Sequence, residues 1–172
     1  EEIKCNFISL DILFICVPND LVLYYKKIFS KSNILVNQII CSSYAKSINY
    51  KDSLNLNGHT SFIDVGFNRT SIISYYDDKI LSLDVLPIGG NNITKDISQI
   101  LEIDLKRSEQ EKRNFDKNLK RLNNEDVSIN TLEKVIFART EEILELCFKS
   151  SDSNLYMYDK LKMVLMGEGS KI

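Results

Sequence analysis

Three short segments, far apart in the chain, carry residue types that suit binding of a phosphorylated ligand. In the first, residues 62–71 (FIDVGFNRTS), an apolar run ends in Asp64, and Gly66 follows two residues later. Backbone N–H groups in a tight turn can hold phosphate oxygens, and a nearby carboxylate can hold Mg²⁺ through water. The same pattern also fits an ordinary hairpin, in which Asp and Gly only supply the turn geometry.

The second segment, residues 163–170 (MVLMGEGS), places Gly167 and Gly169 directly after a predicted strand. Glycines there would let a ligand approach the backbone closely, and a helix that followed would favour an anion at its N-terminus. An ordinary turn from a strand to a helix would have the same sequence.

The third segment is residues 108–113 (SEQEKR), where Glu109 and Lys112 are three residues apart and share one helix face. A lysine stem can lie on an adenine ring, and a carboxylate can accept hydrogen bonds from ribose hydroxyls. The alternative is a solvated, charged helix.

The N-terminal part predicts a βαβ unit. Residues 10–17 (LDILFICV) and 35–40 indicate strands, and apolar positions at spacings of three and four indicate a helix over 20–32. Short connections of this kind predict parallel strands. A short helix is expected over 44–50.

The rest of the chain predicts a meander followed by helices. A polar linker over 51–59 contains Asn57-Gly58, and strands are expected over 60–65, 70–76 and 79–86. Helices are expected from residue 91 or 92, over 108–115 and over 132–148. Residues 116–130 indicate a polar surface excursion, and 161–166 a last strand.

Composition excludes several classes of protein. With 44% hydrophobic residues, 27% charged residues and a net charge of −2, the chain differs from disordered proteins and from dedicated nucleic-acid binders. Apolar runs such as 12–17 are too short to cross a bilayer. Four cysteines without a C-x-x-C pair, and a single histidine, argue against structural zinc. Apolar neighbours predict buried, reduced thiols, which favours the cytosol.

The order of these motifs resembles the actin-like nucleotide-binding superfamily, and most closely the FtsA family of bacterial cell-division proteins. The resemblance rests on five ordered stretches: residues 64–71, 83–97, 105–113, 135–146 and 163–172. It implies an α/β, actin-like (ribonuclease H-like) fold, present in part. The implied divisions are 1–50, the rest of a first-lobe βαβ unit; 51–59, a linker; 60–100 with 160–172, the nucleotide-binding subdomain of the second lobe; and 101–159, its helical subdomain.

The resemblance also implies a site for ATP and Mg²⁺. It places Asp64 near Mg²⁺ through water, and Gly66, Asn68 and Arg69 beside the β- and γ-phosphates. The residues implied to border adenosine are Glu109, Lys112 and Arg113. Those implied to form the floor of the nucleotide site are Gly167, Glu168, Gly169 and Ser170.

Three departures from the family pattern bear on activity. Phe67, Asn68 and Arg69 stand where many actin-like ATPases have Gly-Gly-Thr, and Glu168 stands where a glycine is usual. Residues 41–45 (CSSYA) occupy the place of a Glu-Pro pair, so no carboxylate there can orient a water molecule. We therefore expect the whole protein to bind ATP with, at most, weak hydrolysis. The resemblance implies that the fragment itself binds ATP and Mg²⁺ weakly at best and is inactive, because the first phosphate loop of the superfamily would lie outside it.

The function that the resemblance implies is that of a scaffold. The parent protein would tether FtsZ filaments to the inner face of the cytoplasmic membrane at the division site, self-associate into filaments, and reach the membrane through a helix outside this chain. The chain would be a fragment of that protein. The acidic tail of FtsZ would dock on residues 115–142, through Lys117, Lys120, Arg121, Lys134 and Arg139. The alternatives are an actin-like pilus-assembly scaffold, or a sugar kinase or ATPase of the same superfamily.

Overall fold

The computed structural model describes residues 12–115, 127–150 and 160–171. The chain divides into two compact units, residues 1–42 and residues 43–172. We call them the N-terminal unit and the sheet unit.

The described residues of the N-terminal unit, 12–42, include the helix α1 (Asn19–Ser30), which begins directly after Pro18 and carries Asp20 in its first turn. The predicted helix is therefore confirmed. The strands predicted over 10–17 and 35–40 are wrong, because residues 12–18 and 34–41 form no strand and their apolar side chains are mostly exposed. A strand needs a neighbour for its N–H and C=O groups, and neither segment pairs with another described residue of the N-terminal unit.

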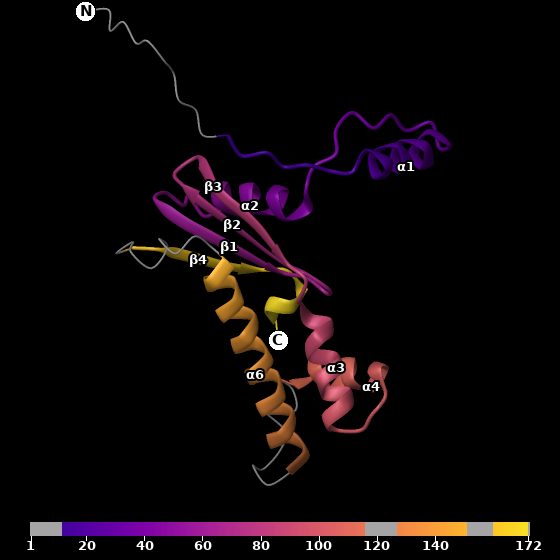
Figure 1. Cartoon of the computed structure of the whole chain (residues 1–172), viewed down its shortest axis with the longest axis vertical. Helices are drawn as coiled ribbons and strands as arrows, with labels where there is room; N and C mark the ends of the chain where they lie inside the picture. The colour runs from indigo at the N-terminus through magenta and orange to yellow at the C-terminus, as the bar shows by residue number, and fades with distance from the viewer. Residues whose placement is uncertain (1–11, 116–126, 151–159, 172) are drawn as a thin grey trace, which may run out of the picture. The chain divides into compact units, whose positions relative to one another are not determined.

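The sheet unit is built on four strands: β1 (His59–Val65), β2 (Thr70–Tyr76), β3 (Lys79–Leu86) and β4 (Lys162–Met166). Their order is β3-β2-β1-β4. β1, β2 and β3 form the predicted antiparallel meander, whereas β4 pairs with β1 in parallel, with Asp64 opposite Met166. The parallel pairing brings the carboxyl ends of β1 and β4 to the same edge of the sheet (Figure 1).

The described residues of this unit also form four α-helices and a short 3₁₀-helix. They are α2 (Ser42–Ser53), α3 (Gly90–Ile100), α4 (Leu105–Arg113), α6 (Val127–Ser150) and the 3₁₀-helix η2 (Glu168–Lys171). Several predicted boundaries were wrong, among them the start of α4, which lies at Leu105 and not at 108. α2 extends through 51–53, which we expected to be linker, and α6 includes 127–130, which we expected to be surface excursion. The remaining residues of that excursion, 116–126, lie outside the described part of the chain.

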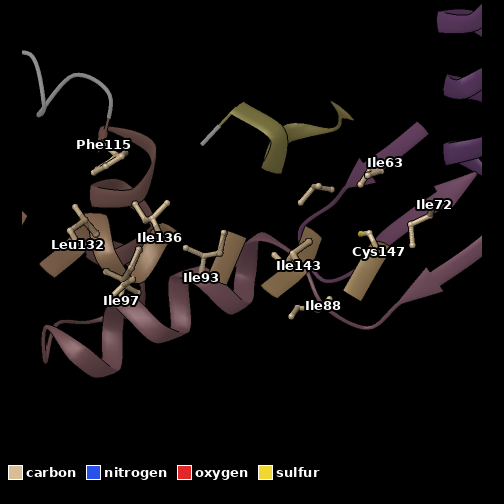
Figure 2. Packing of buried hydrophobic residues seen from close by; sticks show 12 residues of the cluster. Ile63, Ile72, Ile88, Ile93, Ile97, Phe115, Leu132, Ile136, Ile143 and Cys147 are labelled. Carbon is tan, nitrogen blue, oxygen red and sulfur yellow. The ribbon is translucent and has the colours of Figure 1, made fainter. Parts of the chain in front are cut away.

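The sheet is covered on both faces, and successive residues of β1 alternate between them. Ile63 belongs to a core cluster with side chains from α3 and α6, among them Ile93, Ile97 and Ile143 (Figure 2). Phe62 belongs to a second cluster on the opposite face, against which Tyr44 of α2 packs. α3 and α6 therefore lie on one face, and α2 lies on the other (Figure 1).

The thiols differ from the expectation. Cys147 is buried in the core, and burial raises its pKa from 9.0 to about 11. Cys41 is partly exposed and Cys16 is exposed, so the prediction of buried thiols is wrong for Cys16. Among the described helices, none has both the length and the apolar character that a membrane span requires.

Candidate functional site

The turn after β1 is fastened to the N-terminus of α3. The Gly66 N–H donates to the Arg69 carbonyl oxygen at 2.9 Å, which closes the turn. In the other direction, the Gly66 carbonyl accepts from the Gly90 N–H at 2.9 Å, and the Phe67 carbonyl accepts from the Asn91 N–H at 2.7 Å. The first N–H groups of α3 are thus already bonded to this turn, and Gly66 itself has no free donor for a phosphate.

The side chains of the turn face outward. Phe67, Asn68 and Arg69 are all exposed, and Asn68 Oδ1 accepts from Asn91 Nδ2 at 3.0 Å. These are the residues that replace the small ones common in actin-like ATPases. Their exposure leaves side chains, rather than bare backbone, at the surface of the turn.

Lys112 connects α4 to the same helix end. Its buried ammonium donates to the Gly90 carbonyl at 2.9 Å and to Thr94 Oγ1 at 2.7 Å. Lys112 Nζ also lies 2.7 Å from Glu109 Oε2. Since Gly90 in turn bonds to Gly66, the turn after β1, the start of α3 and the Glu109–Lys112 pair form one connected group.

Glu109 is held as a carboxylate by its neighbours. Burial alone would raise its pKa, but hydrogen bonds to the ionised form outweigh that effect and lower the pKa from 4.5 to about 2. The donors, largest effect first, are Lys112, Thr94 and Arg113. Glu109 and Lys112 therefore satisfy each other, and Arg113, which is exposed, is the one of the three implied adenosine-binding residues that faces solvent.

The glycines after β4 lie against the end of β1. A Cβ atom placed on Gly167, which has φ +92°, would lie 2.5 Å from Asp64 Oδ1 and 2.5 Å from the Val65 carbonyl oxygen. A Cβ on Gly169 would lie 2.5 Å from Val65 Cγ1. Glycine is required here because the two backbone segments approach too closely for any side chain.

Glu168, which follows β4, interacts electrostatically with Arg113 of α4. The pKa of Arg113 is raised, chiefly by its hydrogen bond to Glu109 and to a smaller degree by the negative charge of Glu168. Two of the segments that we singled out, 62–71 and 108–113, therefore meet at the start of α3. The third, 163–170, lies against the end of β1, beside the first. The side chain of Ser170 lies outside the described residues.

Asp64 is buried and already has partners. Both of its carboxylate oxygens accept from Lys46 Nζ, at 3.0 and 2.9 Å, and Oδ2 also accepts from Ser43 Oγ at 2.8 Å. The positive charge beside this carboxylate is an ammonium, which would repel a second cation. Elsewhere among the described residues, no group of three or more His, Cys, Asp or Glu side chains could hold a metal. As arranged, the residues around Asp64 do not fit Mg²⁺.

The implied docking residues are only partly described. Lys117, Lys120 and Arg121 lie outside the described residues, and Lys134 is exposed on α6. Arg139 pairs with Asp96 of α3 and with Glu142 of α6. These side chains line an open cleft of about 310 Å³ between α3 and α6, together with Gln99, Ile100, Val135 and Ala138.

Sequence reasoning missed two residues of interest. Lys46 was one of many lysines with no local pattern, and its partner Asp64 is 18 positions away. Phe137 is 63% exposed on α6, one residue before cleft-lining Ala138. An aromatic residue inside the otherwise polar face of a predicted amphipathic helix was the signal that could have identified it.

The solved structures that resemble this chain are actin-like proteins. A PilM–PilN type IV pilus biogenesis complex matches with a TM-score of 0.69 and 18% identity, over 89% of this chain and 42% of that one. MreB 5 of Spiroplasma citri, bound to AMPPNP, matches with a TM-score of 0.61 and 14% identity, over 89% and 54%. The ethanolamine utilization protein EutJ from Carboxydothermus hydrogenoformans matches with a TM-score of 0.59 and 16% identity, over 84% and 47%.

These likenesses establish the actin-like fold, and the chain spans only about half the length of the proteins that it matches. No curated protein sequence matches it. The model of the family "Cell division protein FtsA" matches residues 61–147, about half of the chain. The chain therefore belongs to the family that this model describes, within the actin-like superfamily.

Proposed function

We propose that the chain is the second-lobe part of an actin-like protein that binds ATP and serves as a scaffold in cell division. The observation that carries this proposal is that residues 64–66 are connected to both of the other segments: Gly66 and Lys112 each bond to Gly90 at the start of α3, and Gly167 lies against Asp64 and Val65. A nucleotide site assembled from distant segments is what the actin-like fold would require. The partly exposed ammonium of Lys46 and the exposed Arg113 supply positive charge that suits a phosphorylated ligand.

The proposed task is to tether FtsZ filaments to the cytoplasmic membrane. Membership of the FtsA family supports this role over an unrelated use of the fold. The whole protein would lie in the cytoplasm, on the inner face of that membrane at the division site. It would self-associate into filaments and hold the membrane through a segment outside the chain.

Hydrolysis of ATP would be slow. Residues 41–45 provide no carboxylate to orient a water molecule, and the nearest acidic side chain at the end of β1, Asp64, is occupied by Lys46 and Ser43. Binding, rather than turnover, is therefore the proposed property of the site.

The α3–α6 cleft is the proposed docking place for the FtsZ tail. Phe137 offers an exposed aromatic anchor next to it, and Lys134, three residues earlier on α6, offers a positive charge. Arg139 could exchange its ion pair with Asp96 for an acidic group of the tail. An apolar anchor beside cations suits a peptide that carries both apolar and acidic residues.

Titration of the isotope-labelled chain with an FtsZ C-terminal peptide, followed by NMR, tests this docking. We expect shifts in the amides of Asp96, Lys134 and Phe137. Amides of β3, such as that of Leu81, serve as the control and should not move. Absence of shifts along α6 and α3 would contradict the proposed partner.

A second candidate is a scaffold for pilus assembly. It is favoured by the TM-score of 0.69 to the PilM–PilN complex over 89% of this chain. The same titration with the PilM-binding segment of PilN separates the two. Binding of that segment, with no response to the FtsZ peptide, would favour the pilus role.

A further inference from the structure

The ion pair between Lys46 and Asp64 is held in place by the packing of the sheet unit. Asp64 lies two residues after Phe62 on β1, so its side chain points to the face that α2 covers. It is 5% exposed and accepts from Ser43 as well as from Lys46. Both donors come from the first turns of α2.

The rest of α2 fixes the position of Lys46. Tyr44 packs against the cluster that contains Phe62, and Ser47 Oγ lies 2.8 Å from the Tyr75 hydroxyl of β2. The residues on either side of Lys46 are therefore anchored to the sheet. The ammonium reaches Asp64 from a fixed starting point, rather than as a chance contact of a free surface lysine.

The ammonium also remains accessible. The Lys46 side chain is 45% exposed, whereas the Asp64 side chain is almost fully covered. A lysine ammonium has three N–H donors, and its two contacts are both with the one carboxylate of Asp64. One donor therefore remains for an anion that approaches from solvent.

The Lys46–Asp64 ion pair lies at the carboxyl ends of β1 and β4. Gly167 lies directly against Asp64 Oδ1, and Gly66 follows two residues after Asp64. In the sequence-based interpretation, this is the place where Mg²⁺ would be held. In the structure, a positive charge belonging to the protein lies there instead.

We infer that Lys46 acts as the built-in cation of this site, so that the pocket takes the phosphate oxyanions of a purine nucleotide without a divalent metal ion bound at Asp64. The inference rests on the proposed nucleotide-binding function. It reverses the expectation that Asp64 holds Mg²⁺. Asp64 then has the role of positioning the ammonium, and Lys46 contacts the ligand.

The first test needs no nucleotide. Mn²⁺, a paramagnetic substitute for Mg²⁺, is added to the isotope-labelled chain, and NMR line broadening is followed at the amides of Gly66 and Gly167. We expect no site-specific broadening in the wild type or in Lys46→Arg, which keeps the charge, and clear broadening in Lys46→Ala, where Asp64 is free. Broadening in the wild type, or none in a folded Lys46→Ala variant, would overturn the inference.

The second test uses the wild-type chain, so it does not depend on the folding of a variant. ATP affinity is measured by calorimetry with Mg²⁺ and again with EDTA. We expect the two affinities to agree within about twofold, and Lys46→Ala to bind about tenfold more weakly in EDTA, a change of about 1.4 kcal/mol. A wild type that loses ATP in EDTA contradicts the inference. A wild type that binds ATP in neither condition contradicts the proposed function and, with it, the phosphate contact of Lys46. The Mn²⁺ experiment then still decides whether Lys46 keeps a divalent metal ion away from Asp64.

Discussion

The ammonium of Lys112 and the carboxylate of Glu109 form an ion pair of 2.7 Å on one face of α4, with the lysine only 4% exposed. The sequence suggested that these two residues would face adenosine. The structure shows that they also bind α4 to the N-terminus of α3, through Gly90 and Thr94. The pair therefore holds α4 to the start of α3, and its contact with adenosine stays a prediction.

This ion pair predicts an acid-sensitive contribution to stability. The pKa of Glu109 is lowered from 4.5 to about 2, so the stabilisation is complete above about pH 5 and is lost as the pH falls towards 2. We expect wild type to lose about 1 kcal/mol more than Glu109→Gln over that range, since solvent screens part of the interaction. Urea unfolding between pH 2 and pH 6 measures this difference. Parallel pH profiles for the two proteins would refute it.

Loss of Lys112 should destabilise the chain at neutral pH. Lys112→Met removes three hydrogen bonds of a buried ammonium and leaves Glu109 with weaker partners, so we expect a cost of about 2–3 kcal/mol in the free energy of unfolding. Arg107→Met is the matched control. Arg107 lies on the same helix, but its pair with Glu111 is at 4.0 Å and exposed. Equal effects of the two substitutions in urea unfolding would contradict a structural role for Lys112.

The core between α3 and α6 offers a sharper comparison. Ile97 is 0% exposed and Ile100, three residues later on α3, is 54% exposed. Ile97→Ala should lower the free energy of unfolding by about 2–5 kcal/mol, because it leaves a cavity. Ile100→Ala should change it by less than about 0.5 kcal/mol. Thermal and urea unfolding of both variants check this, and similar losses would mean that α3 does not pack as described.

Two glycines with positive φ allow the cost of backbone strain to be measured apart from the cost of a steric clash. Gly167 has φ +92° and lies against Asp64 and Val65, whereas Gly58 has φ +77°, and a Cβ atom placed on it would meet nothing within 4 Å. Both alanine substitutions carry the strain of the left-handed region, about 1–2 kcal/mol. Only Gly167→Ala must also displace the end of β1. We expect it to cost clearly more in urea unfolding, and equal costs would disprove the close approach of β4 to β1.

The exposed aromatic ring of Phe137 should matter for binding and not for folding. Phe137→Ser is expected to weaken binding of an FtsZ tail peptide by about tenfold or more, with an unchanged unfolding midpoint. Leu81→Ser, on β3, is the control, since that side chain is also exposed but lies away from the cleft. Calorimetry compares the three affinities. If Phe137→Ser bound the peptide as tightly as wild type, the proposed docking in the α3–α6 cleft would be wrong.

The sequence predicted best those elements whose signals are local. Strands β1, β2 and β3 were predicted within one residue, because β-rich runs are separated by turn residues such as Asp77, which has φ +49°. The strands expected over 10–17 and 35–40 failed, because an apolar run does not say whether a partner strand is present. The period of a helix needs no such partner, so α1 was predicted correctly.

The residues of the candidate site show the same difference between local sequence signals and long-range contacts. Asp64, Gly66 and Gly167 could be identified because glycine and aspartate after a strand are a local pattern, and the structure brings them together. The pairing of Lys46 with Asp64 could not, because it depends on how α2 packs on the sheet. A lysine in a lysine-rich chain carries no information about its partner until that packing is known.

We propose that three distant segments bind one nucleotide together, and mapping ATP binding on the isotope-labelled chain by NMR tests this proposal. We predict that the amides of Gly66, Gly90, Arg113 and Gly167 shift together with a single affinity. Those of Gly58 and Tyr76, at the opposite end of the same strands, should stay in place. Shifts confined to one segment, or an absence of shifts at saturating ATP, would contradict the account.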